Sequence, residues 1–204
     1  MHTESYGSSE LERVRSRLAD WAPERIVTTG GGGSSFGAFP SVSEFAAWSR
    51  GAPLLAERAG VTLPERYLLV SLGTGTSILS IAGANYHRAG GSALGGGAVV
   101  GLGKLLLGAT SFEEIAGLAA EGDRRRVDLL VGDIYASGEL PLPADINAAS
   151  FAKLDSRENA DLAHALMGLV GENIALICAC LLYTSPSPRD QRGSGVAGWG
   201  CKKK

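Results

Sequence analysis

Apolar residues at helical spacing predict two helices in the first third of the chain. One runs from Leu11 to Trp21 and ends before Pro23. The other is expected to begin near Ser41, because Glu44 follows three residues later, as in a capping box.

Two apolar runs of strand length come next, and a glycine turn joins them. Residues Tyr67 to Leu72 form a nearly continuous apolar run, and Ile78 to Ala82 form a second one. The polar turn Gly73 to Ser77 lies between them, so the pattern predicts a hairpin. A shorter strand is expected at Arg25 to Thr29, directly before the glycines at 30–33.

The rest of the ordered chain has a helical pattern. A second glycine stretch, Gly90 to Gly97, precedes an apolar helix over Ala98 to Leu107. Ser111 is the predicted cap of a further helix. Helical stripes then follow at 127–134 and at 162–177.

Composition and charge narrow the class of protein. The chain has 204 residues, 45% of them hydrophobic and 20% charged, which is typical of a soluble globular protein. Its net charge of -2 provides no basic field for nucleic acid or for an anionic membrane. The apolar stretch 162–182 contains His164, Glu172 and Asn173, so a buried helix is favoured over a membrane span. Three cysteines without a disulfide framework favour the cytoplasm.

We divide the chain into three parts. Residues 1–24 form an N-terminal helix, and 25–180 form the main domain. Residues 181–204 are rich in Ser, Pro, Gly and basic residues without periodicity, and are expected to be disordered. This tail is typical of a translated sequencing adapter, and the alternative is a natural linker.

The glycine stretches supply the candidate chemistry. The chain has 29 glycines, and some of them cluster in the two turns next to strands and helices. Such turns surround phosphate oxygens with backbone N–H groups, since no side chain holds the backbone away. The alternative is tight turns in a glycine-rich sheet protein. Neither turn matches a Walker loop or a Rossmann fingerprint.

Six motifs together carry a family resemblance. In order and spacing from about Arg25 to Ala179, the chain resembles type II pantothenate kinases, most closely their bacterial branch. The motifs are Thr29-Gly-Gly-Gly, Ser43-Glu44-Phe45, Leu72 to Ile78, Arg88 to Gly97, Gly101 to Leu106, and Gly122-Asp123 with Val127 to Tyr135.

The resemblance implies a fold and a reaction. The fold is the α/β, ribonuclease-H-like fold of actin, Hsp70 and sugar kinases, incomplete here, with a helical segment after the second glycine loop. The reaction is transfer of the ATP γ-phosphoryl group to pantothenate, giving 4′-phosphopantothenate at the start of coenzyme A synthesis. The resemblance also implies Mg²⁺ held by phosphates and water, a homodimer, and regulation by CoA or acyl-CoA. The alternatives are a non-catalytic dimerisation or regulatory fragment, and a related sugar or amino-sugar kinase.

Residue roles follow from the same motifs. Glu44 would be the catalytic base, since a carboxylate can accept the proton of the attacking alcohol. Its rival role is that of the capping partner of Ser41. Arg88 would hold the substrate or the transferred phosphoryl group. The nucleotide would be bound by the glycines and hydroxyls of the two turns: Gly73, Thr74, Gly75, Thr76, Ser77, Gly95, Gly96 and Gly97.

Two expected features of the family are missing from the sequence. Family members begin with a strand and an Asp-x-Gly-Gly-Thr loop, and no part of this chain matches that loop. The strand and helices expected to close over the adenine should follow Ala179, where the tail stands instead. We therefore expect a chain truncated at both ends, marginally stable and inactive on its own.

Overall fold

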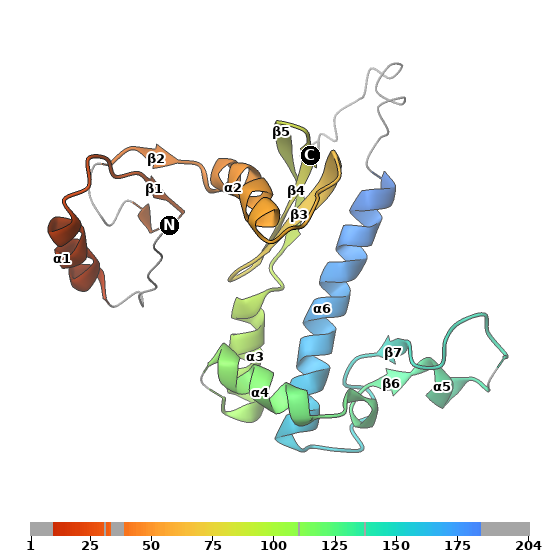
Figure 1. Cartoon of the computed structure of the whole chain (residues 1–204). Coiled ribbons are helices and arrows are strands. Elements are labelled where there is room, and N and C mark those ends of the chain that lie inside the picture. Colours follow the sequence, from red (N-terminus) through yellow and green to blue (C-terminus); the bar gives the residue numbers. More distant parts are fainter. Residues whose placement is uncertain (1–9, 31, 34–38, 110, 137, 185–204) are drawn as a thin grey trace, which may run out of the picture. The chain divides into compact units, whose positions relative to one another are not determined.

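The computed structural model describes residues 10–30, 32–33, 39–109, 111–136 and 138–184 as a mixture of helices and small sheets (Figure 1). The chain divides into two compact units, one made of residues 1–69 and 79–88 and the other of 70–78 and 89–204. The mixed α/β class expected from the sequence is therefore confirmed.

The first unit contains two helices and a pair of very short strands. Helix α1 has the predicted bounds, whereas the predicted strand at 25–29 is reduced to two residues. Its elements are α1 (Leu11–Trp21), β1 (Thr28–Thr29), β2 (Ser41–Val42) and α2 (Glu44–Arg58).

The start of α2 corrects the expected capping box. Ser41 pairs with Thr28 in the parallel strands β1 and β2, so its backbone is extended and cannot begin a helix. Helix α2 begins at Glu44, with Ser43 at the N-cap position and no side-chain capping hydrogen bond. The rival role of Glu44 as the partner of a Ser41 cap is therefore wrong.

A three-stranded sheet follows in the order β3 (Arg66–Leu72), β4 (Thr76–Ala82) and β5 (Asn85–Ser92). The predicted hairpin is confirmed, and Ile78 and Leu79 in its second strand are fully buried. Strand β5 was not predicted, because its sequence has no alternation of apolar and polar residues. It includes Gly90 and Gly91, which we had placed in a loop.

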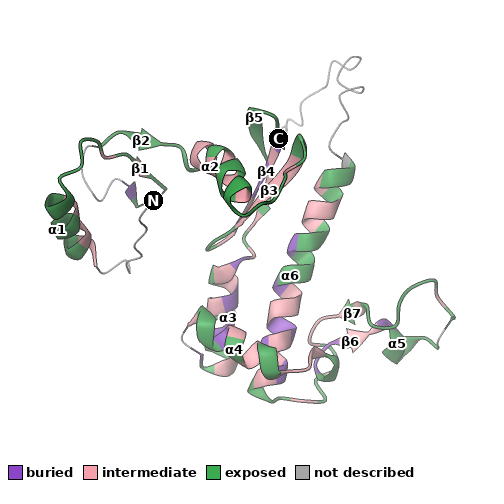
Figure 2. Ribbon diagram, viewed as in Figure 1, coloured by how far each residue is buried: buried purple, intermediate pink, exposed green. Residues whose placement is uncertain are grey.

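Three helices of the second unit build the main core. They are α3 (Gly96–Leu107), α4 (Phe112–Glu121) and α6 (Asn159–Thr184), with α6 lying alongside the other two (Figure 1). The Ser111 cap is confirmed, since its hydroxyl accepts a hydrogen bond from the Glu114 amide at 3.1 Å. The apolar faces of the three helices meet in a buried cluster (Figure 2), which also includes Ala109 from the connection between α3 and α4: Val99, Ala109, Ile115, Ala163, Leu166, Val170 and Ile174.

The predicted helical stripe at 127–134 is wrong. This segment contains a 3₁₀ turn and a short strand before a single helical turn. Its elements are η2 (Arg124–Arg126), β6 (Leu129–Leu130) and α5 (Val131–Ile134), and β6 pairs antiparallel with β7 (Asn147–Ala149). The Asp128 carboxylate accepts a hydrogen bond from the Phe151 amide, and the Asp133 carboxylate accepts one from the Leu130 amide. These bonds stabilise the breaks between the elements, and the spacing of apolar residues does not reveal them.

Arg124 joins this segment to α6. The Arg124 side chain is only 17% exposed. Its guanidinium contacts the buried Asp128 carboxylate at 2.8 Å and both carboxylate oxygens of Glu172 at 2.8 and 3.1 Å. Gly168 leaves the space that this guanidinium occupies, because a methyl group there would collide with it. The pairing with Arg124 also lowers the pKa of Glu172 below its usual value of 4.5.

Helix α6 is long and apolar enough, by length and composition, to cross a membrane, with a mean hydropathy of 2.0. Within the second unit, Ala163, Leu166 and Val170 of this helix belong to the buried cluster, while 22% of the residues in its apolar stretch are buried. The helix also continues through Leu181–Thr184, the first residues of the predicted tail. Residues 185–204 lie outside the described part of the chain.

The Arg124–Glu172 pair predicts a pH-dependent loss of stability. Because the folded pKa of Glu172 lies below 4.5, the contribution of the pair is complete above that pH and fades as the pH falls below it. At pH 7, Glu172→Gln should lower the free energy of unfolding by roughly 0.5–1 kcal/mol, a small effect because the carboxylate is partly exposed. Urea unfolding from pH 7 to pH 3 should show the difference from the wild type shrinking. Glu121→Gln is the control, and a difference independent of pH would contradict the assignment.

Candidate active site

The two predicted glycine turns touch each other through their backbones. The amide of Gly96 donates to the Gly73 carbonyl at 2.8 Å, and the amide of Gly97 donates to the Thr74 carbonyl at 2.9 Å. The first turn is closed by its own bond, from the Gly73 amide to the Gly75 carbonyl at 2.9 Å. We call residues Gly73–Gly75 together with Gly95–Gly97 the glycine hub.

The hub requires glycine because the two backbones are in van der Waals contact. A Cβ on Gly95 would lie 2.8 Å from the Gly75 backbone, and one on Gly97 would lie 2.8 Å from the Thr74 carbonyl oxygen. A Cβ on Gly75 would lie 3.0 Å from the Ser92 carbonyl oxygen. The two turns to which the sequence analysis assigns the nucleotide therefore lie in direct contact.

Thr76 stabilises the hub through a hydrogen bond to the residue before Gly95. It is buried at the start of β4, and its hydroxyl donates to the Leu94 carbonyl at 2.7 Å. The Leu94 amide in turn donates to the Ser92 hydroxyl at 3.0 Å. The turn itself is therefore shorter than the predicted Gly73 to Ser77, since Thr76 and Ser77 belong to the strand.

The observed hydrogen bonds correct the expectation of which backbone N–H groups are free to bind a ligand. We expected free N–H groups at the glycines that open α3, but the amides of Gly96 and Gly97 donate to carbonyls of the other turn. The amides of Thr74 and Gly75 take no part in these contacts. If the hub binds phosphate, its donors therefore come from the tip of the first turn rather than from the first residues of α3. That Gly95, Gly96 and Gly97 bind the nucleotide stays a prediction.

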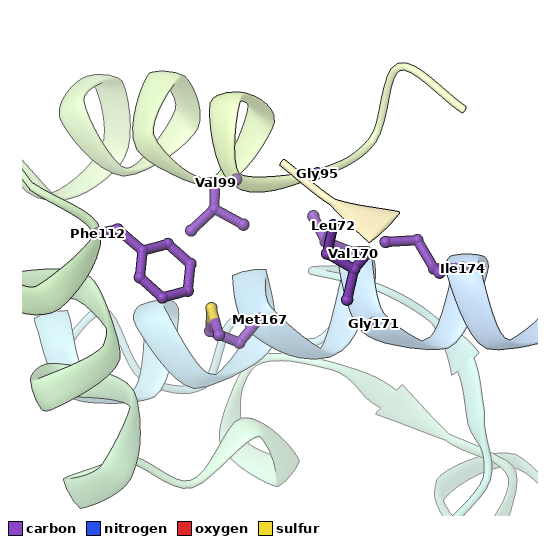
Figure 3. A pocket seen from close by; sticks show the side chains of 9 residues that line it. Leu72, Gly95, Val99, Phe112, Met167, Val170, Gly171 and Ile174 are labelled. Carbon is purple, nitrogen blue, oxygen red and sulfur yellow. The ribbon is translucent and has the colours of Figure 1, made fainter. Parts of the chain in front are cut away.

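An apolar pocket of about 180 Å³ opens beside the hub (Figure 3). The end of β3, the start of α3, the start of α4 and one face of α6 form its walls. Phe112 is 41% exposed and turns its ring toward the pocket, facing Val99 and Met167. The lining residues are Leu72, Gly95, Gly96, Val99, Phe112, Met167, Val170, Gly171 and Ile174.

Sequence reasoning missed the pocket residues. From their spacing, we assign the apolar residues of α6 to a helical stripe, and Phe112 receives no role. One signal was available: Phe112 is a large aromatic residue directly after the Ser111 cap, at the first position of its helix.

Glu44 and Arg88 lie in the first unit, whereas the hub and the pocket lie in the second. Glu44 is the first residue of α2, and Arg88 lies in β5. Their roles as base and phosphoryl-binding residue stay predictions.

In the described part of the chain, no group of three or more His, Cys, Asp or Glu side chains gathers as metal ligands. The described residues therefore form no protein cage for Mg²⁺, and we derive no step through that ion.

Comparison with known proteins gives the family. The Fumble family model matches residues 56–184. A type II pantothenate kinase of Oceanobacillus iheyensis is 34% identical over 186 residues, covering 87% of this chain and 69% of the relative. The type II pantothenate kinase of Staphylococcus epidermidis is 38% identical over 143 residues, covering 68% and 54%. That of Staphylococcus aureus is 32% identical over 178 residues, covering 80% and 66%.

The chain belongs to the Fumble family, alongside these type II pantothenate kinases. The resemblance drawn from the six motifs is thereby confirmed, including its bacterial character, since the three relatives come from bacteria. The chain spans between about half and about two thirds of the length of these curated relatives. The Fumble match begins inside α2 and ends with α6, so it covers the hub and the pocket but not Glu44.

The hub predicts that a single methyl group has opposite effects at two nearby glycines. Gly95→Ala should lower the free energy of unfolding by about 1–3 kcal/mol, because its Cβ would strike the Gly75 backbone. Gly101→Ala, on the same stretch of chain, meets no atom within 4 Å and should raise it by about 0.5–1 kcal/mol. Urea unfolding measures both. Equal stability of the two variants would show that the hub contact is absent.

Proposed function

We propose that the protein carrying this sequence transfers the γ-phosphoryl group of ATP to pantothenate, forming 4′-phosphopantothenate and ADP. The observation that carries the proposal is the similarity, along 87% of the chain, to a protein named type II pantothenate kinase. The glycine hub beside an apolar pocket supports it, because a nucleoside triphosphate needs backbone donors for its phosphates and an apolar surface for its base.

We place the base of ATP in the pocket and its phosphates at the tip of the first turn. The pocket is lined by apolar side chains and glycines, which suits the flat face of a purine better than the hydroxyls and carboxylate of pantothenate. The Thr74 and Gly75 amides and the Thr74 hydroxyl lie in the turn that touches the pocket wall at Gly95 and Gly96.

Glu44 and Arg88 divide the chemistry between them in this proposal. The Glu44 carboxylate accepts the proton of the primary hydroxyl while the oxygen–phosphorus bond forms and ADP leaves with the bonding electron pair. Arg88 holds oxygens of the transferred group with its charged fork. ATP brings Mg²⁺, whose ligands are phosphate oxygens and water.

We further propose the remaining properties that the family resemblance implies. These are the ribonuclease-H-like fold of the actin, Hsp70 and sugar-kinase superfamily with 25–180 as the kinase-like domain, a homodimer, regulation by CoA or acyl-CoA, and action in the cytoplasm. The names of the relatives do not favour the alternatives of a sugar kinase or a non-catalytic module.

The reaction is tested in a chimera in which residues 25–180 replace the matching segment of the Staphylococcus aureus relative. We expect phosphorylation of pantothenate but not of glucosamine. Glu44→Gln should reduce kcat by about 10²- to 10⁴-fold, the usual contribution of a general base. Glu57→Gln, on the same helix, is the matched control. Full activity of Glu44→Gln would remove Glu44 from the role of base, and phosphorylation of glucosamine in place of pantothenate would overturn the substrate assignment.

The placement of the base is tested at Phe112. Phe112→Ala removes the aromatic wall of the pocket and should weaken binding of a non-hydrolysable ATP analogue by about tenfold, the effect of losing one aromatic–base contact. Leu105→Ala, at a residue 78% exposed on α3 and outside the pocket lining, should leave binding unchanged. Isothermal titration calorimetry on the 204-residue chain measures both. Unchanged affinity in Phe112→Ala would place the base elsewhere.

A further inference from the structure

Gly171 occupies an unfavourable position for a glycine. It lies near the middle of α6, where glycine is among the least favourable residues for a helix and alanine the most favourable. A Cβ built on Gly171 would meet no atom within 4 Å, so packing within the described structure does not require its absence.

Some other helical glycines of the second unit have a neighbour that accounts for them, whereas Gly101 and Gly117 also have open space at the Cβ position but lie outside the pocket lining. A Cβ on Gly168 would collide with the Arg124 guanidinium, and one on Gly103 would collide with the Ile115 side chain. Gly168 and Gly171 are about one turn apart on the same helix. A Cβ on Gly168 would meet the Arg124 side chain, whereas a Cβ on Gly171 would project into open space.

Gly171 faces the pocket. Met167, Val170, Gly171 and Ile174 follow the spacing of one helical face, and all four line the cavity (Figure 3). An alanine methyl group at 171 would therefore occupy space at the pocket wall without displacing any protein atom.

We propose that Gly171 is a specificity-determining residue that keeps the wall of the pocket open for the purine ring of ATP. This inference rests on the proposed function, which places the base in the same pocket. A methyl group at 171 fills part of the cavity of about 180 Å³, so a purine ring loses its position while a smaller pyrimidine ring is affected less.

The test compares Gly171→Ala with Gly101→Ala in the 204-residue chain. Both substitutions place a methyl group in open space on a helix, so each should raise Tm by about 2–4 °C. Only Gly171→Ala should weaken binding of a non-hydrolysable ATP analogue, by roughly tenfold. It should weaken binding of the corresponding CTP analogue less, whereas a merely structural role would not change the preference between the two bases.

The outcomes separate this inference from the proposed function. If the wild-type chain binds the ATP analogue and Gly171→Ala binds it equally well, the inference is overturned and the nucleotide site remains. An equal loss of affinity for the ATP and CTP analogues would also overturn the role in base selection. If the wild-type chain binds no nucleotide, the placement of the base fails and the inference fails with it.

Discussion

Two backbones reach hydrogen-bonding distance on a side-chain face only where a glycine leaves out the Cβ that would otherwise lie between them, and the second unit depends on such an approach. The turn after β3 and the first residues of α3 are locked by bonds from Gly96 to Gly73 and from Gly97 to Thr74. The contact fixes the start of α3 against the end of the hairpin. It therefore positions two walls of the pocket, at Leu72 and at Gly95. A site for a flexible triphosphate gains from walls that are set before the ligand arrives.

Helix α6 forms a further wall, and its position depends on an electrostatic contact at another part of its surface. Arg124 joins the buried Asp128 carboxylate to Glu172, so the helix is tied to the segment between α4 and α6. Burial of Asp128 is favourable only because its charge is paired and its oxygens accept hydrogen bonds from Arg124 and Phe151. One side of α6 is therefore held by the ion pair between Glu172 and Arg124, and Gly168 lies on that side. Another side lines the apolar cavity, and Gly171 lies there.

The sequence predicted the helices and strands that depend on a local pattern of residues. It missed those that depend on pairing or hydrogen bonding with residues elsewhere in the chain. Helix α1, the hairpin and the Ser111 cap were predicted because period, turn residues and capping spacing are properties of a few neighbouring residues. Strand β5 and the breaks at 124–134 depend on Asp128, Asp133 and strand pairing, which spacing does not reveal. The motifs also predicted that the two glycine turns belong together. They did not show that the amides of Gly96 and Gly97 are already bonded, because this depends on which carbonyl faces which amide.

A glycine-rich sequence therefore indicates a binding site only at those glycines where a Cβ would meet no protein atom. The glycines must first be classified by what surrounds the Cβ position. Where a Cβ would strike the protein, as at Gly95 or Gly103, folding alone accounts for the glycine, and no ligand is needed to explain it. Where a Cβ would strike nothing and the position is helical, the glycine lowers stability without a packing reason. At Gly101 such a residue lies outside the pocket lining, and at Gly171 it lies within it. The second position is the one at which a bound molecule supplies the missing explanation, because the space that a methyl group would fill is space that a ligand can use.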